Sequence, residues 1–563
     1  MRKKKFTDGK THKAASLSYV RPVSDVFNVK ESMRLDRKAL LFVLGIFIVL
    51  AGVFYFGKIL DVFNLIRGLI LCVIIFFISS VYFSVRGKEL NKDDKIRSIS
   101  AIVVIGFGAA VIYHYFVGAY LNVGYPTNSF LFIPQDRFMD FINNSQLQTQ
   151  YNGSYSYGGS PTNYLFNLFS LFNNKSVVNN YVIFASFFTV FLLIYNFLYM
   201  KKQNYSFVSH SGDLFILTFL SYPYLFCIDR GNPEMLIFVF LSIAIYCHLR
   251  GRDILAAAFL SFAISAKIYF IIFLLLFLVD KKYKELVLSL LFMVIIKKLM
   301  PLIDKTLYSS ANPSHLQTDL ALISILFIFA ISLVLVNWNK VYNDLKINVM
   351  LFLKHVNLYA IRRKMLIATI TAVSLLAIAG LFTKFGDIYK KIYNDFLGPN
   401  VLYNANYAIG DGGAAHCSSI YGMAKEVLIM TKSKVPVTTL FNVYPFIVAV
   451  LFVGLLIYLF FVEKVIWKKV AILTLSLFAF PFVTADYRLI HIFIPMWLFI
   501  NNETKSKFDP LYAIMFGLML IPNKYFILRG GVGEGSITHA LTIIVFMSLI
   551  IFDGIKNKLK QEC

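Results

Sequence analysis

Charged residues are scarce in this chain of 563 residues. Asp, Glu, Lys and Arg make up 15% of it, and hydrophobic residues make up 58%. Soluble domains contain about 25% charged residues, so the composition excludes an ordinary soluble globular protein. Apolar runs of about 20 residues each leave room for roughly 14–16 membrane helices. The sequence therefore predicts an all-α polytopic membrane protein.

Cysteine is also rare, and no two cysteines have the spacing of a metal site or of a disulfide framework. The five are Cys72, Cys227, Cys247, Cys417 and Cys563. The chain has no aspartate-rich metal motif either. We therefore expect neither a metal ion nor another cofactor.

The net charge of +25 arises from 55 basic and 30 acidic residues. Lys and Arg gather in short connectors between apolar runs, which is the positive-inside pattern of membrane proteins. No basic soluble segment with interleaved aromatic residues is present, so nucleic acid is not an expected partner.

The positions of Lys and Arg predict how the chain is threaded. Both tails and the basic segment 338–364 are expected in the cytoplasm. Two long polar stretches are expected outside, where they would cap a cavity, because irregular backbone cannot face lipid. The expected parts are an N-terminal tail at 1–38, a transmembrane hairpin at 39–97, a main transmembrane domain at 98–553 with outer loops at 121–178 and 385–437, and a C-terminal tail at 554–563.

The first outer loop carries two carboxylates, Asp136 and Asp140. Apolar residues recur around them at helical spacing: Phe138, Phe141 and Ile142. This spacing predicts an amphipathic helix on the membrane surface with both carboxylates on one side. Either carboxylate could act as a general base, or both could be solvated or paired with Arg137.

A second polar cluster separates two apolar runs at Asp229, Arg230, Asn232 and Glu234. Pro233 is expected at the first helical position with Asn232 as its cap. The cluster is either a polar site or a tight turn in which Asp229 and Arg230 neutralise each other. Further along, Lys267 interrupts the apolar run 254–280. Because a lysine in lipid is costly, we expect it to break the helix and to face a wet cavity.

A third cluster contains Asp486, Tyr487 and Arg488, and the second outer loop adds His416 and Ser418. By default His416 would be an exposed loop histidine. The predicted threading, however, brings the cations and the loop carboxylates to one side of the membrane. Such a set suits a lipid-linked phosphate, whose headgroup lies at the interface.

Three passages resemble membrane glycosyltransferases of the GT-C class, specifically glycosyltransferase family 87. They run from Asp140-Phe141 to Tyr164, from Arg230 to Tyr269 and from Phe480 to Pro495, and the loop segment His416 to Tyr421 is also similar. The sequence departs from the family pattern at Asn232-Pro233-Glu234, which replaces a Gln-based turn. It departs again at Phe270, where a proline often stands.

The resemblance implies a GT-C-like bundle that transfers mannose or another hexose from a polyprenyl-phosphate donor to a glycolipid or glycan acceptor, with inversion. Asp140 would be the general base, with Asp136 as the reserve candidate. Donor-phosphate binding would fall to Arg230, Lys267, Arg488 and His416. Substrate binding would fall to Asp229, Asn232, Glu234, Tyr164, Asp486, Tyr487 and Ser418.

The resemblance also implies a bacterial inner-membrane enzyme of cell-envelope glycolipid synthesis with its active site on the outer face. Two alternatives remain at this stage. One is a transporter or flippase of lipid-linked oligosaccharide, which needs a binding site at mid-membrane. The other is a polymerase of lipid-linked surface oligosaccharide.

Overall fold

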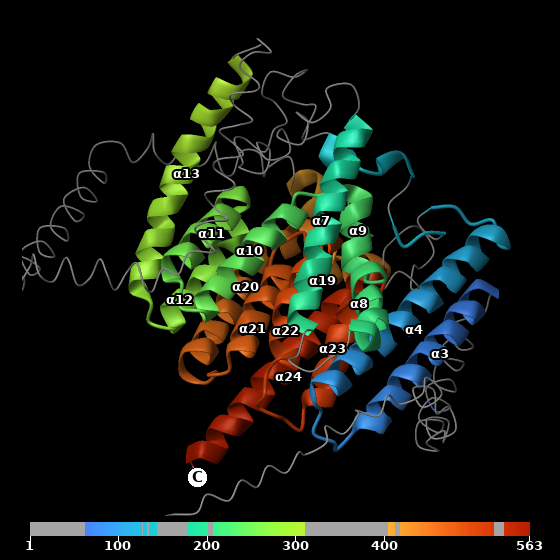
Figure 1. The fold of residues 1–563 in the computed structure, drawn as a ribbon. Helices are drawn as coiled ribbons and strands as arrows, with labels where there is room; N and C mark the ends of the chain where they lie inside the picture. The colour runs from blue at the N-terminus through green and yellow to red at the C-terminus, as the bar shows by residue number, and fades with distance from the viewer. Residues whose placement is uncertain are drawn as a thin grey trace, which may run out of the picture.

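The computed structural model describes Gly45 and residues 62–125, 128–131, 134–142, 177–200, 207–309, 404–410, 417–522 and 534–562. Within these ranges the chain forms helices that pack side by side, as Figure 1 shows. Four of the features predicted from the sequence lie outside the described residues: Tyr164, His416, the segment 338–364, and parts of the two predicted outer loops, namely most of 121–178 together with 385–403 and 411–416. The all-α architecture predicted from composition is confirmed.

Five described helices are long and apolar enough to cross a membrane. They are α3 (Val62–Val85), α4 (Lys92–Ala119), α7 (Val177–Met200), α20 (Val437–Phe461) and α24 (Glu534–Glu562). Helices α8 (Phe207–Phe219) and α9 (Tyr222–Arg230) together form a sixth candidate, bent by 44°. The described part is thus a multi-pass membrane protein.

The remaining described helices are mostly shorter. They are α10 (Glu234–Leu249), α11 (Asp253–Ala266), α12 (Leu274–Val279), α13 (Tyr283–Ser309), α19 (Ile420–Met430), α21 (Ile466–Ala479), α22 (Phe493–Ile500) and α23 (Asp509–Met519), with 3-10 turns η2 (Pro134–Asp136), η3 (Ile268–Phe273) and η7 (Asp486–Ile492) and the π-turn η5 (Asn404–Ile409). Helices of about 11–16 residues are about 17–24 Å long, less than the roughly 30 Å hydrocarbon layer. Several apolar segments that the sequence predicts as membrane spans therefore form helices that are too short to cross the hydrocarbon layer alone.

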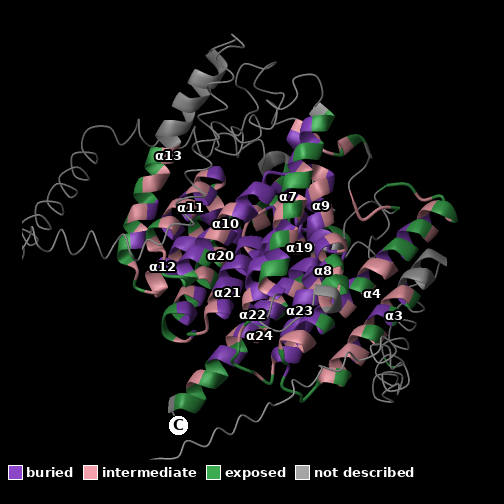
Figure 2. Cartoon of the chain, viewed as in Figure 1, coloured by how far each residue is buried: buried purple, intermediate pink, exposed green. Residues whose placement is uncertain are grey.

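The buried core lies in the middle of the bundle. Figure 2 shows buried residues concentrated in α10, α21, α22 and α23, whereas exposed residues are common on the peripheral helices. The exposed positions of α20 include large apolar side chains such as Phe446 and Phe461. A face of this kind suits lipid as solvent, so α20 fits the edge of the bundle.

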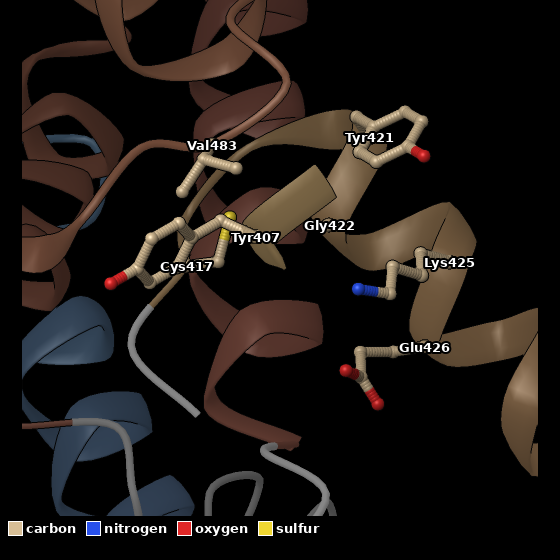
Figure 3. Close-up of a pocket in the computed structure, with 7 residues that line it drawn as sticks. All are labelled: Tyr407, Cys417, Tyr421, Gly422, Lys425, Glu426 and Val483. Atoms are coloured by element: carbon tan, nitrogen blue, oxygen red, sulfur yellow. The ribbon is translucent and has the colours of Figure 1, made fainter. Parts of the chain in front are cut away.

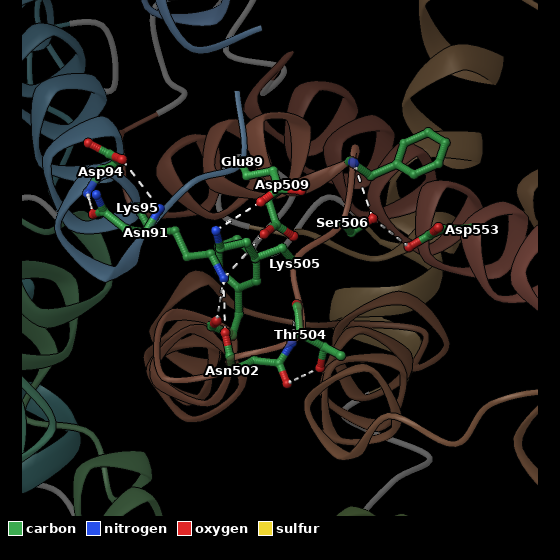
Figure 4. Close-up of polar contacts among 12 residues, drawn as sticks. Glu89, Asn91, Asp94, Lys95, Asn502, Thr504, Lys505, Ser506, Asp509 and Asp553 are labelled. Atoms are coloured by element: carbon green, nitrogen blue, oxygen red, sulfur yellow. Dashed lines mark hydrogen bonds and ion pairs between the residues drawn. The ribbon is translucent and has the colours of Figure 1, made fainter. Parts of the chain in front are cut away.

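Helix α4 is held to the C-terminal part by a buried lysine. Lys95 is 1% exposed, and its Nζ lies 3.3 Å from Asp509 Oδ2. The same ammonium donates to the carbonyls of Phe499 at 3.2 Å and Asn502 at 3.3 Å (Figure 4). A capping box at Asn91 begins α4 and so sets the position of Lys95 in its first turn.

A second ion cluster lies at the C-terminal end of α10. Asp280, in the turn after α12, accepts from Lys469 Nζ at 2.7 Å and lies 2.9 Å from His248 Nε2. Burial raises the pKa of Asp280, but the contacts with His248 and Lys469 outweigh it and lower the pKa from 3.8 to about 2. The two ends of α10 therefore carry separate polar clusters, because Glu234 stands at the other end.

Candidate active site

The turn between α9 and α10 carries the first group of polar residues. Gly231 ends α9 with φ +63°, a left-handed conformation that glycine adopts at little cost. A Cβ at this position would lie 2.8 Å from Phe141 Cβ, so the first outer loop approaches the turn closely. The N-cap residue of α10 is Pro233, so the predicted cap at Asn232 is wrong by one residue. Asn232 Oδ1 nevertheless accepts from the backbone N–H of Glu234, the first residue of α10, at 3.0 Å.

Residues 134–142, which belong to the predicted first outer loop, do not form the predicted continuous amphipathic helix, and that prediction is wrong. A 3-10 turn ends at Asp136, and Phe138 has φ +62°, which interrupts helical geometry before residues 139–142. The cause is tertiary. The Phe138 N–H donates to the Asp229 carbonyl at 2.8 Å, and its ring stacks on Tyr181 with centroids 4.0 Å apart.

Asp140 contacts the α9–α10 turn through both carboxylate oxygens. Arg230 Nη2 donates to Oδ1, and Asn232 Nδ2 donates to Oδ2 at 2.5 Å. Arg230 is fixed in turn, since its Nη1 donates to the backbone carbonyl of Asp136 at 3.1 Å. Asp140 and Arg230 keep 18% and 15% of their side-chain surface exposed.

Charges that are adjacent in the sequence thus have partners elsewhere. Asp229 pairs with Arg137, whose Nε lies 3.3 Å from Asp229 Oδ1, while Arg230 pairs with Asp140. The alternative in which Asp229 and Arg230 neutralise each other is therefore wrong. The pairs instead tie residues 137–140 to the α9–α10 turn.

Glu234 is the centre of a second group, and its side chain is fully buried. Lys267 Nζ lies 2.8 Å from Oε1, and His491 Nε2 lies 2.8 Å from Oε2. Tyr269 donates to Oε1, and Arg488 Nε lies 3.7 Å from the same oxygen. One carboxylate thus gathers side chains from the η3 region and from η7.

Lys267 breaks its helix as the sequence predicts. It caps α11 with extended backbone angles of φ −145° and ψ 116°, and η3 follows. Its ammonium lies 5.4 Å from the centre of the Tyr487 ring, and the Arg488 guanidinium lies 4.0 Å from that of Tyr269. Lys267 and Arg488 are 18% and 11% exposed, so aromatic faces and one carboxylate surround two largely buried cations.

A third group surrounds Asp486, which is 2% exposed. Tyr222 donates to Oδ2 at 2.5 Å, Ser418 donates to Oδ1, and His539 Nδ1 lies 3.5 Å from Oδ1. The Ser418 N–H also donates to the Thr484 carbonyl at 2.7 Å. These contacts join α9, α24 and the segment before α19 to Asp486, which is the first residue of η7.

A small pocket opens beside the third group. Its lining consists of Tyr407, Cys417, Tyr421, Gly422, Lys425, Glu426 and Val483, and Figure 3 shows the side chains of Lys425 and Glu426 extending from α19. Its volume of about 10 Å³ holds about one water molecule. This pocket is therefore too small for a sugar. In the described part of the chain, no three His, Cys, Asp or Glu residues are placed to hold a metal ion.

Most of the residues that the sequence singles out lie in or beside these three connected groups. Asp136 contributes a backbone carbonyl to Arg230, while Tyr164 and His416 lie outside the described residues. The sequence pattern indicates no role for four members of these groups: Tyr222, Tyr269, His491 and His539. Each has an aromatic ring and stands in or beside an apolar run. In such a position the sequence predicts an ordinary residue of the hydrophobic core. The available signal is that a Tyr or His carries a polar atom, which needs a hydrogen-bond partner when the residue stands in an apolar run.

Comparison with known proteins supports the resemblance. Residues 164–303 match the model of glycosyltransferase family 87. The matched segment contains the α9–α10 turn, Lys267 and Tyr269. No curated protein and no solved structure matches the chain.

Proposed function

We propose that this chain, a membrane glycosyltransferase by its match to family 87, transfers a hexose such as mannose from a polyprenyl-phosphate donor to a lipid-linked or glycan acceptor, with inversion. The observation that carries the proposal is that a partly exposed carboxylate, Asp140, contacts the α9–α10 turn, and that Glu234 directly after this turn contacts Lys267 and Arg488. Lys and Arg gather in the connectors that are predicted to be cytoplasmic. This distribution supports an active site on the outer face of a bacterial inner membrane.

In the proposed reaction, Asp140 removes the proton from an acceptor hydroxyl. The hydroxyl oxygen attacks the anomeric carbon from the face opposite the phosphate, and the bond from this carbon to the phosphate oxygen breaks. General-base help of this kind contributes about 10²–10⁴ in rate. The products are the glycosylated acceptor and polyprenyl phosphate, which leaves with the bonding electrons.

The leaving phosphate gains negative charge as the bond breaks. Lys267 and Arg488 are the described cations best placed to stabilise it, because both lie beside Glu234 at the start of α10 and both keep part of their side-chain surface exposed. Preorganised cations in a water-poor site stabilise developing charge more strongly than they would in water. Glu234 keeps the cations in place before the donor binds.

The test is transfer by the purified protein in detergent with a synthetic prenyl-phosphate sugar or with the matching nucleotide sugar. We expect activity with the lipid donor and none with the nucleotide sugar alone. Asp140→Asn should lower kcat by at least about 10²-fold. Asp136→Asn is the matched control and should retain most of the rate. Activity with the nucleotide sugar only would overturn the proposal, and loss of rate in Asp136→Asn alone would transfer the role of base to that residue.

The role of the cations has its own test. Lys267→Met removes a positive charge from the cluster and should raise KM for the lipid donor by about 10-fold or more, with a smaller effect on acceptor KM. Lys505→Met is the control, because Lys505 is 49% exposed and pairs with Glu89 at 2.8 Å, away from the cluster. Equal donor KM values for the two variants would contradict the assignment of Lys267.

A further inference from the structure

The amide of Asn232 lies between two of the three polar groups. Its side chain is 4% exposed. Its Nδ2 donates to Asp140 Oδ2 at 2.5 Å, and its Oδ1 accepts from the Glu234 N–H at 3.0 Å. Lys267 Nζ lies 3.5 Å from the same Oδ1. One side chain therefore contacts both the carboxylate proposed as base and the group that surrounds Glu234.

The hydrogen-bond partners fix which way the amide faces. A backbone N–H and an ammonium can only donate, so the atom that faces Glu234 and Lys267 must be the amide oxygen. The NH₂ group must then face Asp140, whose ionised carboxylate can only accept. A flipped amide would place its oxygen against a carboxylate oxygen at 2.5 Å and its NH₂ against two donors.

We infer that Asn232 is a positioning residue that orients the Asp140 carboxylate, an inference that rests on the proposed function. Arg230 holds one oxygen and Asn232 holds the other, so the plane of the carboxylate is set by two residues of one turn. Because the same amide is anchored to the first residue of α10 and to Lys267, the base and a donor-binding cation keep a fixed separation. A shift of about 1 Å in such a site can cost about 10² in rate.

A purely structural role for Asn232, as the acceptor for the first N–H of α10, makes different predictions. Side-chain oxygens of Ser and Asp accept backbone N–H groups at the start of a helix about as well as that of Asn does, so Asn232→Ser and Asn232→Asp both preserve the bond to the Glu234 N–H. Neither preserves the bond to Asp140, because the serine hydroxyl is too short to span the gap and an ionised aspartate cannot donate. We expect both variants to melt near the wild-type temperature, with kcat lowered by about 10-fold or more in Asn232→Ser and further in Asn232→Asp, which adds a like charge beside Asp140. Donor KM in Asn232→Ser should remain within about threefold of wild type.

A double-mutant cycle tests whether Asn232 acts through Asp140. If it does, adding Asn232→Ser to Asp140→Asn should lower the residual kcat no further, because the group that it orients is already lost. Multiplied losses would show an independent role and overturn the inference, as would wild-type kcat in Asn232→Ser. Asn501→Ser is the control substitution, since Asn501 accepts from Lys92 at 2.7 Å outside the site. If Asn232→Ser unfolds, the isosteric Asn232→Asp replaces it in both measurements, which are kcat of the single variant and kcat of its combination with Asp140→Asn.

The outcomes also separate this inference from the proposed function. A wild-type protein that is inactive with every lipid-linked sugar would refute the proposed function. An active wild-type protein with an equally active Asn232→Ser variant would refute only the role of Asn232.

Discussion

At the scale of the single residue, the Glu234 carboxylate allows two cations, Lys267 and Arg488, to lie close to one another. Two of its partners are the basic residues Lys267 and Arg488, whose side chains are only 18% and 11% exposed. Without a nearby anion their mutual repulsion would be strong, because charges interact more strongly at low dielectric. The carboxylate thus lets Lys267 and Arg488 share one site in the absence of substrate.

Removal of this carboxylate should therefore be costly. Glu234→Gln leaves buried positive charge uncompensated, and we expect a loss of about 3 kcal/mol or more of stability. The measurement is the melting temperature of the purified protein in detergent. Glu89→Gln is the matched control, because Glu89 is 73% exposed in its pair with Lys505, and its melting temperature should not change. Equal effects of the two substitutions would contradict a central role for Glu234.

The residues of the site could be predicted unequally from the sequence. Asp140, Arg230 and Lys267 stand out because charge is rare in this chain and costly in a membrane. Tyr222 and His539 do not stand out, since their partner Asp486 is far away in the sequence and only folding brings them together. The pairing of Arg230 with Asp140, rather than with neighbouring Asp229, had no local signal for the same reason.

At the scale of the element, the α9–α10 turn depends on Gly231. Its positive φ and the nearby Phe141 leave no room for a side chain. Because Phe141 follows Asp140 directly, any displacement of Phe141 also moves the proposed base. The turn and the first outer loop therefore have to be considered as one unit.

Two glycine substitutions test this dependence. Gly231→Ala should combine backbone strain of about 1–2 kcal/mol with overpacking against Phe141 of about 1–3 kcal/mol, and it should lower activity. Gly251→Ala is the control, because Gly251 has a similar φ of +67° but nothing within 4 Å of an added Cβ. We expect it to show the strain alone and to retain activity. Thermal melting and a transfer assay measure the two effects, and equal losses in both variants would refute the close approach of Phe141.

Helices differ in how well the sequence predicts their limits. The long apolar runs give α3, α20 and α24 because their length alone requires a helix in lipid. The break at Lys267 could also be predicted, since its charge opposes continuation of the run. The interruption at Phe138 could not, because apolar spacing favours a helix there and only the Asp229 carbonyl and the Tyr181 ring select the observed backbone.

At the scale of the whole molecule, Asp280 joins the ends of α10 and α12 to α21 and makes stability depend on pH. Its pKa is lowered to about 2 in the folded protein from an ordinary 3.8. A depressed carboxyl pKa stabilises the fold above the unfolded value, and this contribution disappears as pH falls from about 4 to about 2. The cluster is partly exposed, so its contribution is about 1–2 kcal/mol.

Asp280→Asn tests the direction of this dependence. The variant should melt at a lower temperature than wild type at pH 7, because His248 and Lys469 lose their anionic partner. The difference between the two proteins should shrink as pH falls from about 4 to about 2, where wild type loses the same charge. A difference that stays constant down to pH 2 would contradict the lowered pKa. Melting curves over this range in an acid-stable detergent provide the measurement.

The buried contact between Lys95 and the C-terminal part also orders the events of biosynthesis. Lys95 reaches the membrane early, yet the Phe499 carbonyl that it contacts lies 404 residues further along the chain, and Asp509 follows later still. Until the ribosome has made that part, the ammonium must remain in water at the membrane surface or near the translocon. Helix α4 can therefore insert early but can dock only late. A nascent chain that stops before residue 499 should expose Lys95, and with it the flank of α4, to the quality-control proteases of the membrane.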